Sequence, residues 1–128
     1  MRRLGPALAL LAALAAGCGG DDEGGAGKRS VTVPPGATVR VTAREYEFDP
    51  GRIIVKGAGR LTLRLRNAGS LAHNLKVFRG DEEIGGTPTF PPGRTESGVV
   101  NLEHGNYRLL CTVGDHADLG MTGTLVVR

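Results

Sequence analysis

The last fifth of the chain holds three side chains that bind soft metal ions. Cys111, His116 and Met121 are spaced as Cys-x4-His-x4-Met, which places a thiol, an imidazole and a thioether in one short segment. The whole chain has only three His and two Met, and one of those Met is the initiator. Taken alone, each of these residues is more often a core or loop residue. Their combination in one segment indicates a metal site.

A fourth candidate ligand, His73, follows from the expected pairing of two strands. His73 comes just before a candidate strand at 74–79, and Cys111 ends a candidate strand at 106–111. If the two strands run antiparallel, the start of one lies beside the end of the other, so His73 would meet the segment 111–121. Zinc sites favour Cys and His without Met, whereas two His and one Cys with a long axial Met are typical of blue copper. The set predicts one bound copper ion.

The segments that position these side chains have the pattern of half-buried strands. Apolar and polar residues alternate in 39–44 and in 61–66, which is the period of a strand with one face in the core. No stretch after Ser30 has a convincing helical period, and Gly, Pro, Asn and Asp turns separate the apolar runs. We therefore expect an all-β fold, an antiparallel sandwich or small barrel of about seven to eight strands. The other candidate strands are 52–55, 74–79, 98–102, 106–111 and 123–127.

The N-terminus has the pattern of an export signal. A short basic start is followed by an uncharged run of Leu, Ala, Gly and Pro, so residues 1–17 are expected to be a signal peptide. The run is too short to span a membrane. Cys18 follows small residues, as in the box of bacterial lipoproteins, and is expected to be acylated. Residues 18–29 are rich in Gly and would form a linker, which leaves 30–128 as the folded domain.

Length and charge exclude several classes of protein. A chain of 128 residues folds as one domain, so separate cofactor and substrate domains are excluded. Removal of residues 1–17 takes away Arg2 and Arg3 and leaves 14 basic residues against 13 acidic ones. Such a balance gives no basic stripe for nucleic acid, and we expect no nucleic-acid partner. His104 has no potential ligand near it in sequence and is interpreted as a turn residue.

The ligand set, with the strands around it, resembles the cupredoxin family, in particular small bacterial plastocyanin- and azurin-like proteins. The resemblance covers about residues 37–128. It implies a Greek-key β-sandwich with His73, Cys111 and His116 as equatorial copper ligands and Met121 as the axial ligand. It also implies that Asn74 steadies the ligand loop next to the thiolate. The motifs that carry it are Tyr46-Glu47-Phe48-Asp49-Pro50, His73-Asn74-Leu75, Gly105-Asn106-Tyr107 and the segment 120–127.

By this resemblance the protein would be a one-electron carrier between redox proteins outside the cytoplasm. Four protein ligands leave no open metal position for a substrate, so we expect no enzymatic activity. We expect a monomer in the periplasm or on the outer face of the cytoplasmic membrane, touching the membrane only through an N-terminal lipid. Three alternatives remain: a copper carrier or storage protein with the same ligands, a thiol enzyme using Cys111 and His116, and a metal-free adhesion sandwich.

Small and apolar residues flank the predicted ligands on both sides of the expected site. Leu71 and Ala72 precede His73, and Ala117 and Leu119 follow His116. They would form either an apolar docking patch or merely a cap on the sandwich.

Overall fold

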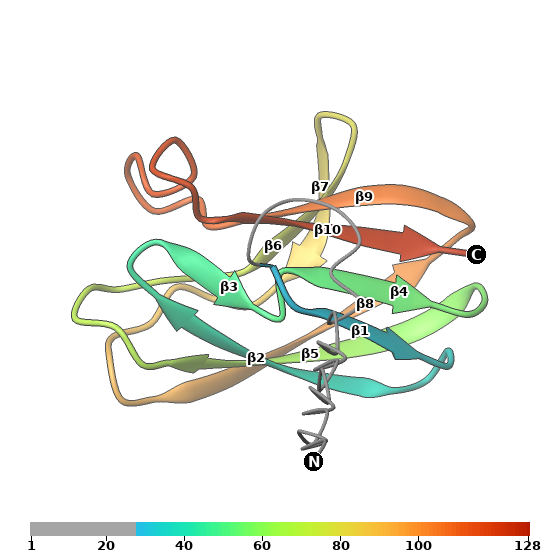
Figure 1. Ribbon diagram of the computed structural model, residues 1–128, viewed down its shortest axis with the longest axis horizontal. Helices are drawn as coiled ribbons and strands as arrows, with labels where there is room; N and C mark the ends of the chain where they lie inside the picture. The colour runs from blue at the N-terminus through green and yellow to red at the C-terminus, as the bar shows by residue number, and fades with distance from the viewer. Residues whose placement is uncertain (1–27) are drawn as a thin grey trace, which may run out of the picture.

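Alternating apolar and polar residues build two β-sheets packed face to face in the computed structural model, which describes residues 28–128 (Figure 1). The expected signal peptide, the expected acylation site at Cys18 and nearly all of the expected linker lie outside these residues. No helix long and apolar enough to cross a membrane occurs in the described range.

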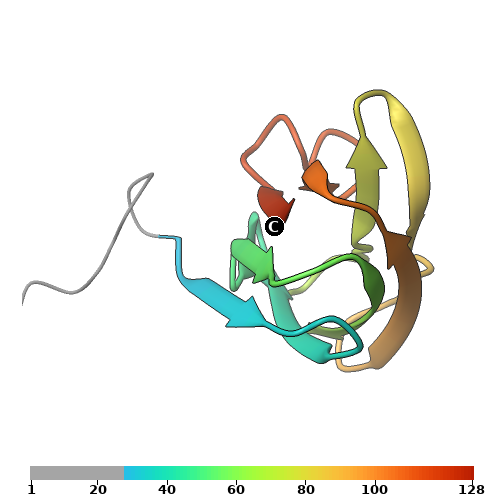
Figure 2. The ribbon, with the colours of Figure 1, turned by 90° about the vertical axis from the view of Figure 1, so that its right-hand side faces the viewer.

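Ten strands make up the two sheets in the described part of the chain. One sheet has six strands in the order β1-β4-β10-β9-β6-β7, and the other has four in the order β3-β2-β5-β8. Figure 2 shows the two layers after a quarter turn. The strands are β1 (Ser30–Val33), β2 (Thr38–Arg44), β3 (Glu47–Asp49), β4 (Arg52–Val55), β5 (Gly59–Asn67), β6 (Lys76–Arg79), β7 (Glu82–Gly86), β8 (Thr95–Leu102), β9 (Gly105–Leu110) and β10 (Thr122–Val127).

The core lies between the two sheets and is filled by the apolar side of each alternating strand. On β5 the side chains of Leu61, Leu63 and Leu65 are fully buried. Arg64 and Arg66 lie on the opposite face of the strand and are exposed. The other sheet contributes buried residues such as Ile53, Val77, Leu109 and Leu125. Burial of this apolar surface is the main favourable term in folding such a sandwich.

The all-β sandwich is confirmed, but its sheets are mixed rather than antiparallel. The pairs β1–β4, β4–β10 and β2–β5 run parallel. Three short strands, β1, β3 and β7, were not among the sequence candidates. The alternating pattern shows which face of a strand is buried, but it contains no information on the direction of the neighbouring strand.

Close contact between β7 and β8 joins the two sheets along one side. A Cβ atom added at Gly98 would collide with the backbone carbonyl oxygen of Gly86, so no larger residue fits at position 98 without a backbone shift. Gly86 itself has a φ of +137°, a backbone conformation that residues with a side chain rarely adopt. The two glycines therefore let the sheets approach each other at this side, next to β6, which begins three residues after His73.

Candidate metal centre

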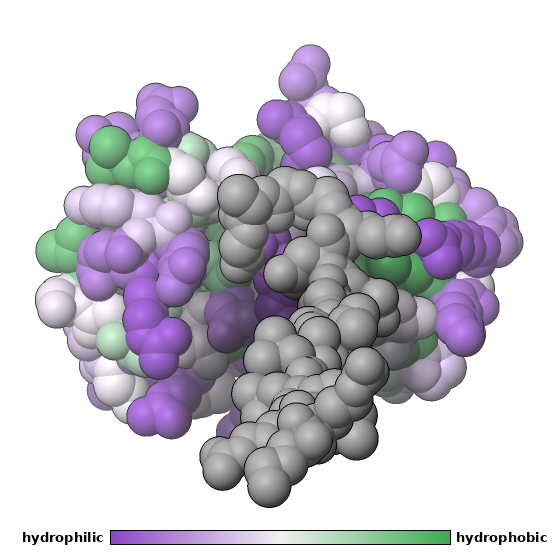
Figure 3. Space-filling view, viewed as in Figure 1, coloured by the Kyte–Doolittle hydropathy of each residue, from purple (hydrophilic) through white to green (hydrophobic). Residues whose placement is uncertain are grey.

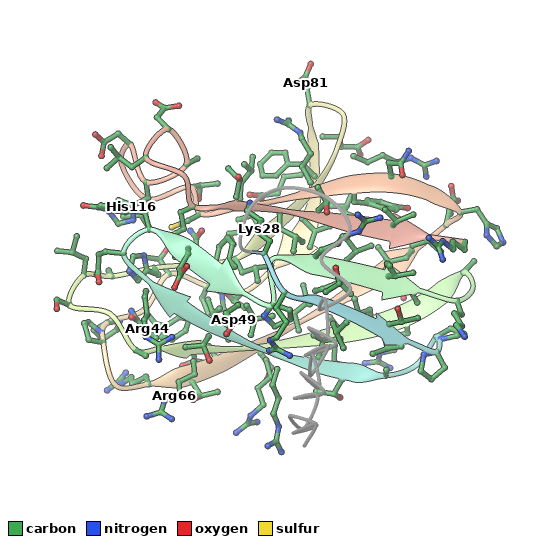
Figure 4. The ribbon with its side chains drawn as sticks, viewed as in Figure 1. Lys28, Arg44, Asp49, Arg66, Asp81 and His116 are labelled. Atoms are coloured by element: carbon green, nitrogen blue, oxygen red, sulfur yellow. The ribbon has the colours of Figure 1, made fainter. Side chains whose placement is uncertain are left out.

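The predicted pairing of the two ligand-bearing strands is confirmed. β6 and β9 run antiparallel, with Lys76 opposite Leu110 and Phe78 opposite Arg108. The residues that precede β6 therefore lie beside those that follow β9. Figure 4 shows His116 at one end of the molecule, in the loop between β9 and β10. We call this end the His116 pole.

Three of the proposed ligands converge beneath the surface of the pole. The Sγ atom of Cys111 lies 3.8 Å from Nδ1 of His73 and 3.6 Å from Nδ1 of His116. The ligand atoms of all three residues lie within 4.8 Å of one another, and all three residues are buried. A thiol and two imidazole nitrogens thus face one common point.

These distances fit a shared metal ion. Taking the bond lengths of Zn²⁺ as a guide, a thiolate at about 2.3 Å and an imidazole at about 2.0 Å from one ion, at an angle of roughly 110–120°, would lie about 3.5–3.8 Å apart. Both sulfur–nitrogen distances, 3.6 and 3.8 Å, correspond to this geometry. The donor set therefore fits a single soft or borderline ion without movement of the backbone.

Met121 joins this group through the backbone. Its amide donates to the carbonyl of His116 at 3.0 Å, and its own carbonyl accepts from the amide of Cys111 at 3.2 Å. The side chain is fully buried in the same core cluster as Cys111. The loop therefore closes on itself and brings its first and last proposed ligands side by side.

His73 is held at both its backbone and its ring. Its amide and carbonyl form a β-bridge with Phe90, at 3.2 and 3.1 Å. Its Nε2 lies 3.0 Å from Oε1 of Glu45. Because an ionised carboxylate can only accept a hydrogen bond, Nε2 carries the hydrogen in the neutral ring, and Nδ1 then keeps its lone pair toward Cys111.

Glu45 is an ionised group at the edge of the site. Burial works to raise its pKa, but hydrogen bonds from the amides of Ser70, Leu71 and Glu45 itself and from His73 outweigh burial and lower the pKa from 4.5 to about 2. The carboxylate is therefore charged over the whole physiological pH range. Its side chain remains 25% exposed, so solvent reaches it from one side.

His116 lies just under the surface and is packed against two rings. Its centroid lies 5.0 Å from that of His73 and 5.2 Å from that of Tyr46, both tilted. Leu71 and Leu119 are 44% and 51% exposed. Figure 3 shows hydrophobic side chains among polar ones at this end of the molecule, over the loop between β9 and β10.

Asn74 links the two ligand-bearing segments through hydrogen bonds of its side chain. Its Nδ2 donates to the hydroxyls of Thr89 and Thr112, both at 2.8 Å. Its Oδ1 accepts from the amide of Thr112 at 2.9 Å. Thr112 directly follows Cys111, so the amide of Asn74 fixes the backbone beside the thiol. His104 is exposed in the turn between β8 and β9, away from the other two His.

Two polar residues at the pole were missed in the sequence, and both carried a signal. Glu45 continues the inward register of Val41 and Ala43 on β2, and Asn67 continues that of Leu65 on β5. Ala43 lies opposite Asn67 in the sheet, so both polar residues stand at the same end of the core. The side chain of Asn67 holds the loop before His73, because Nδ2 donates to the carbonyls of Leu71 and Phe90 and Oδ1 accepts from Gly69. The sequence signal for Glu45 and Asn67 is a polar residue at a position where the alternation predicts a core-facing side chain.

Three solved structures with the same fold are auracyanins. The auracyanin of the photosynthetic bacterium Roseiflexus castenholzii, in its dithionite-reduced form, superposes with a TM-score of 0.68 at 20% identity, over 73% of this chain and 98% of that one. Auracyanin A of Chloroflexus aurantiacus, described as a "blue" copper protein, gives a TM-score of 0.65 at 22% identity, over 74% and 99% of the two chains. Auracyanin B gives 0.68 at 19% identity, over 73% and 90%.

The fold is therefore that of the cupredoxins, as the sequence resemblance implied. No protein-family model and no curated protein matches the sequence. At identities near 20% the structural likeness establishes the fold alone, and the chemistry of the site depends on the donor atoms of this chain.

Proposed function

We propose that this protein binds one copper ion at His73, Cys111, His116 and Met121 and carries single electrons between redox proteins outside the cytoplasm. The observation that carries the proposal is the convergence of Cys111 Sγ with Nδ1 of both His, buried in a cupredoxin fold. A buried Met121 beside them favours copper over zinc, because a thioether is a soft ligand. The cupredoxin fold of auracyanin A, named a blue copper protein, supports the same assignment.

The residues of the chain suit electron transfer because they hold the donor atoms in place. Copper bound between them would alternate between Cu(I) and Cu(II), which supplies a one-electron couple. The β-bridge to Phe90 fixes His73, and the hydrogen bonds within the loop fix Cys111, His116 and Met121. A frame that keeps its geometry in both oxidation states keeps the cost of rearrangement low. His116 is 7% exposed at the pole, whereas the other three proposed ligands are fully buried. An electron would therefore enter and leave the site through the ring of His116.

The burial of the thiol opposes the enzyme alternative. Cys111 is fully buried, whereas a nucleophilic cysteine must be reached by its substrate. We therefore propose a carrier rather than an enzyme. The copper-storage alternative uses the same donor atoms. It differs from electron transfer in that the copper ion is released rather than kept.

An experiment separates electron carriage from copper delivery. The protein is titrated with Cu(II), studied by cyclic voltammetry, and then exposed in its reduced form to a competing Cu(I) chelator. An electron carrier should bind one copper per chain, give a reversible one-electron wave and keep its metal through repeated cycles. Rapid and complete loss of copper to the chelator, with no reversible wave, would favour delivery or storage instead.

We also propose that the protein is exported and anchored by a lipid on Cys18. The proposal rests on the signal-like segment 1–17 and on Cys18 after small residues. A multiply acylated N-terminal cysteine anchors firmly, whereas a single chain binds a membrane only weakly. Cys18→Ser should therefore move the protein from the membrane to the soluble fraction of the cells that make it. Unchanged fractionation of this variant would favour secretion without an anchor, with the domain at 30–128 free in solution.

A further inference from the structure

One carboxylate oxygen at the pole accepts three hydrogen bonds. Oε1 of Glu45 lies 2.8 Å from the amide nitrogen of Ser70, 2.7 Å from that of Leu71 and 3.0 Å from Nε2 of His73. Glu45 lies between β2 and β3, far from the other three residues along the chain. The carboxylate thus ties a proposed metal ligand to the loop that carries the exposed Leu71.

The ring of His73 has two possible neutral forms, and Glu45 selects between them. In one form Nδ1 is bare and Nε2 carries the hydrogen, and in the other the positions are exchanged. The Glu45 carboxylate accepts from Nε2, so it stabilises the form in which the Nδ1 lone pair points at Cys111 Sγ. Without this acceptor the ring would lose its preference for the form that can bind a metal through Nδ1.

The charge of Glu45 acts on the redox balance of such a site. Cu(II) with one thiolate has a net charge of +1, and Cu(I) with one thiolate is neutral. A carboxylate hydrogen-bonded to a ligand therefore stabilises the more positive, oxidised state. Within residues 28–128 the salt bridges found do not pair Glu45 with a Lys or Arg.

We propose that Glu45 is a positioning residue of the copper site: it holds His73 in the form that binds through Nδ1, and its negative charge lowers the reduction potential. This inference rests on the proposed function, because it takes copper as the occupant. It goes further in assigning a role to a residue outside the four ligands.

The first test changes the charge of Glu45 and keeps its shape. In Glu45→Gln the side-chain oxygen can still accept hydrogen bonds, but a charge-assisted bond is about twice as strong as a neutral one. The copper-loaded variant should keep its colour and shift its Cu(I)/Cu(II) balance about tenfold toward Cu(I), which is about 59 mV for one electron. Glu47→Gln is the matched control, since Glu47 is exposed two residues away and no hydrogen bond links it to the ligands. Equal potentials for wild type and Glu45→Gln would overturn the proposed role of the charge.

The second test needs no copper. In the copper-free protein at about pH 8, above the ordinary imidazole pKa near 6.5, nitrogen NMR reports which ring nitrogen of each His carries the hydrogen. The wild type and Glu45→Gln should show His73 protonated at Nε2, and Glu45→Ala should show a substantial population protonated at Nδ1. His73 that stays protonated only at Nε2 in a folded Glu45→Ala would contradict the positioning role.

The two proposals can fail separately. If the wild-type protein stays colourless with Cu(II), the proposed copper site is refuted. The NMR result would still decide whether Glu45 orients His73. If the wild type is coloured but has the same reduction potential as Glu45→Gln, the copper site is supported and the effect of the Glu45 charge on it is refuted.

Discussion

Every proposed ligand has its backbone amide hydrogen-bonded within the pole. The amide of His73 donates to Phe90, that of Cys111 to Met121, that of His116 to Val113 and that of Met121 to His116. None of these residues therefore depends on a metal for its place in the fold. We expect the copper-free protein to be folded with the donor atoms already near their final positions.

The thioether of Met121 should tune the site without being required for copper binding. Met121→Leu removes a weak donor, and because a weak donor stabilises Cu(II) more than Cu(I), the reduction potential should rise. The change nearly conserves volume, so the free energy of unfolding should fall by less than about 1.5 kcal/mol. Voltammetry of the loaded variant and thermal unfolding of its copper-free form measure the two effects. Complete loss of copper binding would show that Met121 is a primary ligand.

At the scale of the elements, the site depends on two antiparallel strands whose ends meet. β6 and β9 are neighbours in the six-stranded sheet, and the segments that carry His73 and Cys111 extend from them toward the pole. β6 begins only at Lys76, two residues later than the sequence candidate, because Leu75 hydrogen-bonds to Thr87 and Asn74 to Thr112 instead of to a neighbouring strand. The same hydrogen bonds that shorten the strand hold the ligands.

The hydrogen bonds of Asn74 should contribute measurably to stability. Asn74→Ala removes three hydrogen bonds and leaves the amide of Thr112 without its partner. Because each such bond contributes about 1 kcal/mol, the free energy of unfolding should fall by about 2–3 kcal/mol. Asn106→Ala is the control, because Asn106 is exposed on β9 and a surface substitution of this kind typically changes stability by no more than about 0.5 kcal/mol. Denaturant unfolding of the copper-free proteins measures both. Equal losses in the two variants would mean that the Asn74 bonds are replaced by water at no cost.

Sequence patterns located seven of the ten strands in the described residues and missed β1, β3 and β7. The candidate strand at 52–55 has the same bounds as β4, and the alternation at 61–66 lies within β5. β3 has only three residues, too few for alternation to be visible. The core-facing position of Glu45 is visible in the sequence, but its partners at 70, 71 and 73 are not, because they approach it only when β2 and β5 pair in parallel. Cys111, His116 and Met121 could be proposed as ligands because they lie within eleven residues of one another in the sequence.

At the scale of the whole molecule, an arginine-rich sheet face lies next to the His116 pole. The outward positions of β2 and β5 are rich in arginine, and Figure 4 labels two of them, Arg44 and Arg66, below His116 in the view. The pole itself exposes Leu71 and Leu119, with Asp115 and Asp118 as its charged neighbours in the loop. A partner that docks over His116 would meet these two exposed leucines, and weak electron-transfer contacts are small.

Electron exchange should depend on the apolar character of the pole. Leu119→Lys places an ammonium group there, which must lose part of its hydration when two such faces meet in self-exchange, so the exchange rate between reduced and oxidised protein should fall, by about tenfold. Val99→Lys is a matched control, since Val99 is 44% exposed on β8 and Leu119 is 51% exposed. NMR line broadening of mixed oxidation states measures the rate. The absorption spectrum should be unchanged in both variants, and equal rates would mean that electrons leave by another face.

The central claim, a copper ion bound by the thiolate of Cys111, is tested most directly by the visible spectrum of the protein with one equivalent of Cu(II). An intense blue or green colour is expected, because charge transfer from a thiolate to Cu(II) absorbs strongly in the visible range. Cys111→Ser should abolish the colour and keep the β-sheet signal in circular dichroism, since serine differs by one atom in the buried core. A colourless wild type with bound Cu(II), or a Cys111→Ser variant that keeps the colour, would contradict the assignment.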